Sequence, residues 1–74
     1  MRFDVGEVRE YGDGVHDECG HIIYVVLKCT QFHATVLFLY VEKLTAGAHV
    51  GVHKNYRLNE PLFTHSELIV LGTA

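Results

Sequence analysis

The chain lacks any apolar run long enough to cross a membrane, and we do not expect it to be exported. Its apolar stretches fall well short of the ~18 residues that a spanning helix needs. The opening residues MRFDV lead into no long apolar region of the kind that a signal peptide carries. We therefore expect a cytoplasmic protein without membrane contact. The two cysteines, Cys19 and Cys29, are then expected to be free thiols, with a disulfide as the alternative.

Positive charge is scarce as well. Six Lys and Arg stand against nine Asp and Glu, which gives a formal net charge of −3 at pH 7 with neutral histidines. Nucleic-acid-binding proteins draw much of their affinity from cationic contacts to phosphates. The composition therefore argues against general nucleic-acid binding, although it leaves a local basic site open.

Recognisable catalytic motifs are also missing from the sequence. It contains no P-loop, no Gly-x-Ser-x-Gly and no His-Glu-x-x-His. Carboxylates are numerous, but their spacing fixes no two of them at a working separation. A nucleophilic pair of either cysteine with a nearby histidine is the one arrangement left open. We predict no catalytic residue and a protein that is not an enzyme.

Two short apolar runs dominate what the sequence does contain. Residues 22–27 and 36–41 are rich in β-branched and aromatic side chains and are too short for a typical buried helix. A polar stretch separates them. They therefore predict a central antiparallel hairpin with strands at about 21–29 and 34–43.

The remaining segments predict further strands around this hairpin. Residues 3–11 alternate as a first strand, residues 49–53 form a short strand weakened by a glycine, and residues 68–71 form a closing strand. Residues 12–20 and 54–64 are expected to be loops. We predict an all-β fold of about five strands without a long helix. Such strands usually close into a small barrel, because closure removes exposed edges.

The chain resembles the SH3-like small β-barrel proteins of phage and prokaryotes in three segments: FDVGEV at 3–8, YVVL at 24–27 and ELIV at 67–70. The resemblance implies a single five-stranded SH3-like barrel over residues 1–74. A phage-encoded member would work in the host cytoplasm. The resemblance implies an architecture and no particular activity, because such barrels host many functions.

Strand alternation gives each run of the hairpin two apolar faces. One face is purely aliphatic, and the other carries the aromatic side chains of Tyr24, Phe38 and Tyr40. A three-residue loop at 30–32 pairs aliphatic with aliphatic residues and aromatic with aromatic residues, and we expect this register. The aliphatic face is then predicted to form the barrel core.

The aromatic face needs a cover in this interpretation. A second subunit or a partner protein is one possibility, since tyrosine and phenylalanine are enriched at interfaces. The chain's own segments 15–20 or 54–64 are the other. We favour association, because small domains rarely bury two faces unaided. The predicted interface residues are Tyr24, Val36, Phe38 and Tyr40.

The predicted function is accordingly that of a non-enzymatic interaction or assembly module. It would form a homo-oligomer or dock on a host or virion protein, as a phage-encoded or other prokaryotic accessory protein. Burial of the aromatic face would supply ~25 cal/mol for each Å² of apolar surface removed from water, before the costs of association.

A different function is suggested by a cluster in the segment 49–57. It gathers His49, His53, Lys54, Tyr56 and Arg57. The cationic donors suit a phosphate, and a tyrosine ring can stack on a base. The alternative prediction is therefore a protein that binds a small molecule or nucleotide. A solvated loop with a charged rim explains the same residues.

A zinc-stabilised module is the further alternative. Cys19, His21, Cys29 and His33 would make a Cys2His2 ligand set. This arrangement requires residues 29 and 33 to face each other across the hairpin. The Cys-x-His spacing is not a common zinc-finger arrangement, so buried thiols and scattered histidines explain the set equally well. We predict no cofactor, with zinc as the exception to test.

Overall fold

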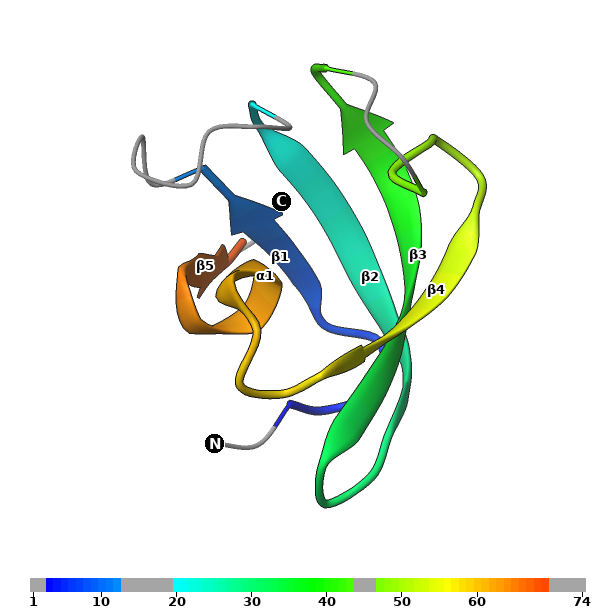
Figure 1. The fold of residues 1–74 in the computed structure, drawn as a ribbon, viewed down its shortest axis with the longest axis vertical. Coiled ribbons are helices and arrows are strands. Elements are labelled where there is room, and N and C mark those ends of the chain that lie inside the picture. Colours follow the sequence, from blue (N-terminus) through cyan, green and yellow to red (C-terminus); the bar gives the residue numbers. More distant parts are fainter. Residues whose placement is uncertain (1–2, 13–19, 44–46, 70–74) are drawn as a thin grey trace, which may run out of the picture.

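The computed structural model describes residues 3–12, 20–43 and 47–69, which form one antiparallel sheet and a short helix (Figure 1). The elements are β1 Val8–Tyr11, β2 Ile22–Cys29, β3 His33–Val41, β4 His53–Arg57, α1 Pro61–Thr64 and β5 Ser66–Leu68. The strands of this five-stranded sheet are ordered β4-β3-β2-β1-β5. The predicted β-rich fold and central hairpin are confirmed. The described part of the chain contains no long helix, and none apolar and long enough to cross a membrane.

The β2–β3 hairpin pairs like side chains across its centre, but the predicted three-residue loop at 30–32 is wrong, because Cys29 pairs with Ala34 and leaves residues 30–33 between them. Tyr24 lies opposite Phe38, and Val25 lies opposite Leu37. Two irregularities in the ladder each add one residue to a strand, at Leu27 in β2 and near Leu39 in β3. Such bulges increase the local twist and bend the strand. The hairpin is therefore strongly curved, as Figure 1 shows for β3.

Two strands begin later than predicted because glycines turn the chain. Gly6 has a φ of 91° and lies in a turn, so β1 starts at Val8 and the segment from residue 3 is not one strand. Gly51 has a φ of 83° and turns the chain just before β4, which occupies His53–Arg57 instead of residues 49–53. Both φ values lie in the left-handed region, which glycine adopts at no steric cost.

The segment 54–64 was predicted to be a loop, and this prediction is wrong. It contains most of β4 and the whole of α1. Pro61 stands at the start of α1, where its missing N–H is not needed and its fixed φ suits a helix. The closing strand β5 is Ser66–Leu68. Residues 70–71 of the predicted strand lie outside the described residues.

The aromatic face of the hairpin is the core, which reverses the prediction. Tyr24, Val36 and Phe38 are fully buried, so they are not available as an interface. Tyr40 alone of the predicted interface residues is well exposed, at 49%. Among the described residues the core consists of Phe3, Tyr11, Ile22, Tyr24, Val26, Ala34, Val36, Phe38, Ala48, Leu62 and Phe63.

The cover of the aromatic face comes from the chain itself. The Phe63 ring of α1 lies 5.9 Å from the Tyr24 ring and 5.1 Å from the Phe3 ring, measured between centroids. Tyr56 of β4 lies 6.2 Å from both Phe38 and Phe63. Aromatic side chains bury more apolar area than aliphatic ones, and edge-to-face contacts add to this gain. The alternative in which segment 54–64 covers this face is therefore the correct one.

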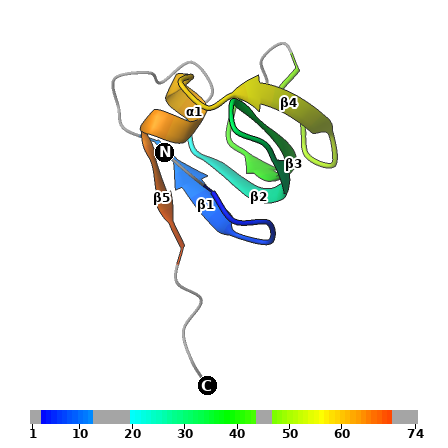
Figure 2. The ribbon, with the colours of Figure 1, turned by 90° about the horizontal axis from the view of Figure 1, so that it is seen from below.

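The helix also stands between the two edges of the sheet. Figure 2 shows α1 between β4 and β5, the strands at opposite ends of the strand order. These two strands are not paired with each other, so the sheet is not closed by hydrogen bonds. The sheet curls around the core with an inner face under α1 and an outer face on its other side. The closed barrel stays a prediction.

Candidate functional site

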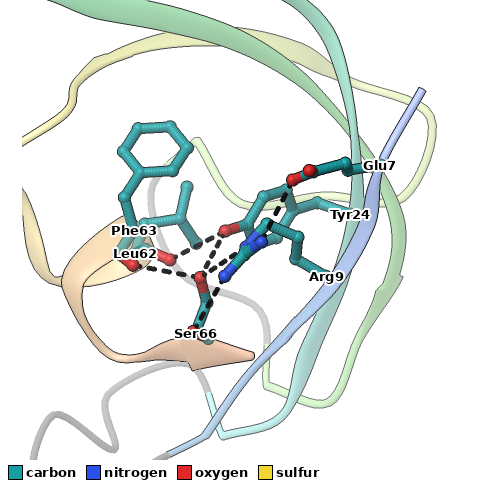
Figure 3. A network of polar contacts seen from close by, with 6 residues as sticks. All are labelled: Glu7, Arg9, Tyr24, Leu62, Phe63 and Ser66. Carbon is teal, nitrogen blue, oxygen red and sulfur yellow. Dashed lines mark hydrogen bonds and ion pairs between the residues drawn. The ribbon is translucent and has the colours of Figure 1, made fainter. Parts of the chain in front are cut away.

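A polar network links the sheet to α1 and β5, and the sequence analysis missed it (Figure 3). The Tyr24 hydroxyl lies 2.7 Å from Ser66 Oγ and 3.0 Å from the carbonyl oxygen of Leu62. Ser66 Oγ in turn donates to the carbonyl oxygen of Phe63, at 3.1 Å. A tyrosine has a single hydroxyl proton, so it donates to one of its two neighbours at a time. The network fastens α1 onto β2.

Arg9 completes this network from β1. Its Nε donates to Ser66 Oγ and its Nη2 to the Ser66 carbonyl oxygen, both at 3.2 Å. Its Nη1 forms an ion pair with Glu7 at 3.1 Å. The guanidinium also lies over the Phe3 ring, 4.5 Å from the centroid. Strand alternation placed Arg9 on the same side as Phe3, which was the only sequence signal for its inward position.

The chemistry of this network is structural. Burial raises the pKa of the Tyr24 hydroxyl, against opposing contributions from the Ser66 hydrogen bond and the Arg9 charge. The phenol therefore stays protonated at neutral pH and is a donor, not a base. Every buried side-chain nitrogen and oxygen in the described residues has a hydrogen-bond partner.

The predicted ligand cluster is split between two faces of β4. His53 and Arg57 point to the outer face, because they lie opposite Leu37 and His33 of β3. Lys54 and Tyr56 alternate with them and point inward, where the Lys54 ammonium lies 5.5 Å from the Tyr56 ring centroid. The five predicted residues therefore do not converge, because strand alternation separates neighbours.

His49 precedes β4 in the chain and is not part of the strand. It precedes the turn at Gly51 and accepts, through its carbonyl oxygen, a hydrogen bond from the backbone N–H of Val52. Its side chain is exposed. Of the predicted ligand residues, Arg57 lines the groove at the hairpin tip.

That groove lies at the tip of the β2–β3 hairpin, beside the chain that leads from β4 to α1. Its volume is about 720 Å³. The lining residues are Gln31, Phe32, His33, Arg57, Leu58, Asn59 and Thr64. The Phe32 side chain is 66% exposed there, although it is a large aromatic residue. The Leu58 N–H donates to the Phe32 carbonyl oxygen at 2.9 Å and holds the two walls together.

The predicted zinc ligands are not brought together where they are described. Cys29 lies opposite Ala34, and His33 lies opposite Arg57, so residues 29 and 33 are not cross-strand partners. His21 precedes the other end of β2 and contacts Glu10, with 2.9 Å between Nδ1 and Oε1. No group of three or more potential ligands forms within the described residues. Cys19 lies outside them.

The outer face of the sheet carries most of the aliphatic residues that were predicted to form the core, together with Val8 and the predicted interface residue Tyr40. We call this surface the outer band; it consists of Val8, Ile23, Val25, Leu27, Leu37, Leu39 and Tyr40. Every side chain of the outer band remains partly or largely exposed. The register places Val8, Val25 and Leu37 side by side on three neighbouring strands. The sequence revealed this stripe but not which side of the sheet it occupies.

The chain matches no protein-family model, and neither the curated proteins nor the solved structures include a significant match to it. The functional argument therefore depends on the residues of this chain alone.

Proposed function

We propose that this protein is a non-enzymatic interaction module that associates with another protein through the outer band. One observation carries the proposal. The centre of the inner face is covered by the chain's own α1 and Tyr56, whereas the outer face presents a stripe of partly or largely exposed aliphatic residues and a tyrosine. A large exposed apolar patch on a soluble domain is typical of an interaction site.

Tyr40 supports the same assignment. Its ring is 49% exposed and lies opposite Ile23 on the outer face, next to the exposed Leu39. Tyrosines are enriched at interfaces because a rigid ring buries much apolar area at little entropic cost. Each Å² of apolar surface that a partner covers contributes ~25 cal/mol, before the costs of association are subtracted.

We also propose that the sheet belongs to the SH3-like small barrels. Two features support this: the strand order β5-β1-β2-β3-β4, and the short helix between the two edge strands β4 and β5. In such an arrangement the core is inside the curled sheet and the outer band is on the wall. The fold then supplies a rigid surface, and the surface residues determine the function.

Site-specific photo-crosslinking tests the interaction. A benzoylphenylalanine is introduced at Tyr40 in the outer band or, as the control, at Val50, which is 61% exposed on the chain between β3 and β4. Illumination in an extract of the source cells should give a heavier protein adduct from position 40 only. Mass spectrometry then identifies the partner. Adducts from neither position, or equally from both, contradict the proposal.

A second candidate function is favoured by the groove at the hairpin tip. The Arg57 guanidinium has no hydrogen-bond or ion-pair partner in the described residues, and it stands with His33 beside the exposed Phe32 ring. A cation next to an aromatic ring suits an anionic ligand with a flat apolar part, such as a nucleotide. The volume of about 720 Å³ lies within the range of small-molecule sites.

Thermal-shift measurements with mononucleotides and cyclic dinucleotides test this second function. A nucleotide that binds the groove should raise the Tm of the wild type and of Lys54→Gln, whose side chain points inward. It should leave the Tm of Arg57→Gln unchanged. An equal shift in both variants would exclude the groove as the binding site, and no shift in the wild type would remove the function.

A further inference from the structure

We infer that the partner of the outer band is a second copy of this chain, docked face to face about a twofold axis. This inference rests on the proposed function and names the partner. It is carried by the charges at the two ends of the outer band, which are opposite in sign and placed on opposite sides of the sheet.

The acidic corner lies on the β1–β5 side and consists of Glu10 and Glu67. These residues are directly opposite each other across the β1–β5 pairing, and both side chains are exposed. Glu10 also contacts His21 and still keeps 46% of its side chain exposed. Since Glu10 lies opposite Ile23, the acidic corner adjoins the outer band directly.

The basic corner lies toward the hairpin tip and consists of His33 and Arg57 on the β3–β4 side, with Lys28 on the neighbouring strand β2. His33 and Arg57 are directly opposite each other across the β3–β4 pairing, and Lys28 lies opposite Thr35 in the neighbouring row. All three side chains of the corner are exposed. The carboxylate of Glu60 accepts the backbone N–H of Arg57 at 2.7 Å, and the guanidinium itself stays available.

The two corners flank the outer band diagonally. β1 and β4 are three strand spacings apart in the sheet, which is roughly 14 Å. The acidic corner lies on the row of Ile23 and Tyr40, and the basic corner lies toward the hairpin tip at residues 30–32. The apolar residues Val25 and Leu37 stand between them.

This diagonal arrangement is self-complementary. Consider two copies whose outer faces meet, related by a twofold axis that lies between the sheets. If the axis is perpendicular to the line joining the two corners, the acidic corner of each copy faces the basic corner of the other. The outer bands then cover each other at the centre. A twofold interface must use the same patch on both subunits, and few patches meet this condition in both shape and charge.

Each corner also gathers like charges within one chain. Like charges that lie directly opposite each other across two strands destabilise the pairing, as Glu10 and Glu67 do. Arg57 on β4 is separated from Lys28 on β2 by the single strand β3, which likewise gathers positive charge at the basic corner. Opposite charges from a second copy relieve both corners at once. A partner of one charge sign would relieve only one of them.

The size of the surface predicts a reversible dimer. The outer band covers the middle strands of a chain whose total accessible surface is 4914 Å². A standard stable interface buries about 800 Å² of each partner, which is roughly one-sixth of this surface. Most of the outer band is only partly exposed, so we expect a reversible dimer with exchange between copies.

Charge reversal tests the inference with two complementary variants. The first is Glu10→Lys with Glu67→Lys, which makes both corners basic. The second is Lys28→Glu with Arg57→Glu, which makes both corners acidic. Asp4→Lys is the control, since Asp4 is an exposed acid outside the strands and outside the outer band. Circular dichroism and Tm establish that each variant folds.

Sedimentation equilibrium and native mass spectrometry give the outcome. The wild type and Asp4→Lys should dimerise with similar constants, and each double variant alone should dimerise about tenfold more weakly or not at all. An equimolar mixture of the two should form the heterodimer, because its corners again pair opposite charges. A monomeric wild type, unchanged dimerisation of the variants or a mixture that stays monomeric overturns the inference.

Neutral variants replace any reversed variant that does not fold. Glu10→Gln with Glu67→Gln, and Lys28→Gln with Arg57→Gln, should each weaken the dimer, and mixing them should not restore it. The charge pairing is contradicted if the mixture of neutral variants dimerises like the wild type, or if neither neutral variant weakens the dimer. If the wild type is monomeric but the crosslinker at Tyr40 captures a different protein, this inference fails while the proposed function stands.

Discussion

Tyr24 lies directly opposite Phe38 in the β2–β3 ladder, and both rings are fully buried on the inner face of the sheet. The Tyr24 hydroxyl extends beyond this pair and reaches the Leu62 carbonyl oxygen at 3.0 Å and Ser66 Oγ at 2.7 Å. One side chain therefore contributes to the core of the hairpin and also fastens α1 and β5 to it. Among the described residues, no helix packs on the outer face in the same way.

Removal of this hydroxyl should destabilise the fold. In Tyr24→Phe the ring stays in the core, but the carbonyl oxygen of Leu62 and Ser66 Oγ lose a buried partner. We expect the free energy of unfolding in urea to fall by about 1–2 kcal/mol. The control is Tyr40→Phe, whose exposed hydroxyl should matter by less than ~0.5 kcal/mol. Equal losses in the two variants would contradict the role of the network.

Stability should also fall at alkaline pH. Burial raises the pKa of Tyr24 above its ordinary value of 10.0, so the folded chain holds this proton more tightly than the unfolded chain does. The resulting stabilisation is fully present below about pH 10 and is lost as the pH rises through the folded-state pKa. Urea unfolding at about pH 9 and about pH 11 should show a smaller loss in Tyr24→Phe than in the wild type.

The two central strands were predictable, because segments 22–29 and 33–41 are rich in β-branched and aromatic residues, which favour a strand over a helix. The like-with-like pairing at the hairpin centre was predicted, but the predicted loop length was wrong. Cys29 pairs with Ala34, and the extra residue at Leu27 then brings Val25 opposite Leu37. Strand β4 was missed, because His53–Arg57 is polar and alternates without an apolar face. Because β4 lies at the edge of the sheet, it does not need an apolar face.

The buried side of the hairpin was not predictable from parity alone. Both parities are apolar, so the choice depends on which residues elsewhere in the chain can cover each face. The deciding segment is α1, whose Leu62 and Phe63 supply the bulk that fits over Tyr24. A proline at the first helical position followed by two large apolar residues was the available signal. The outer band follows as the remaining face.

The Phe63 ring that covers the inner face should be essential for the stability of the fold. Phe63→Ala removes a buried ring that contacts Phe3, Tyr24 and Tyr56. We expect a loss of about 3–5 kcal/mol in the free energy of unfolding, which is most of the stability of a domain this small. The matched control Phe32→Ala removes an equally large ring that is 66% exposed, and it should change stability by less than ~0.5 kcal/mol.

Metal removal should have no effect on the fold. His21, Cys29 and His33 are described at separate places in the sheet, and His21 contacts Glu10 instead of another potential ligand. The Tm measured before and after dialysis against a chelator should agree within error. A drop in Tm that added zinc reverses would show a ligand set beyond the described residues and would restore the zinc-stabilised module as an interpretation.

The two valines at positions 25 and 26 give the most direct test of the account. They are chain neighbours of one residue type, with Val26 fully buried in the core and Val25 on the outer band. Their methyl NMR signals can be followed with a soluble paramagnetic probe at low and high protein concentration. We predict strong broadening of Val25 but not Val26 in the dilute sample, and protection of Val25 as the concentration rises. Broadening of Val26, or a Val25 signal that stays exposed at every concentration, would contradict it.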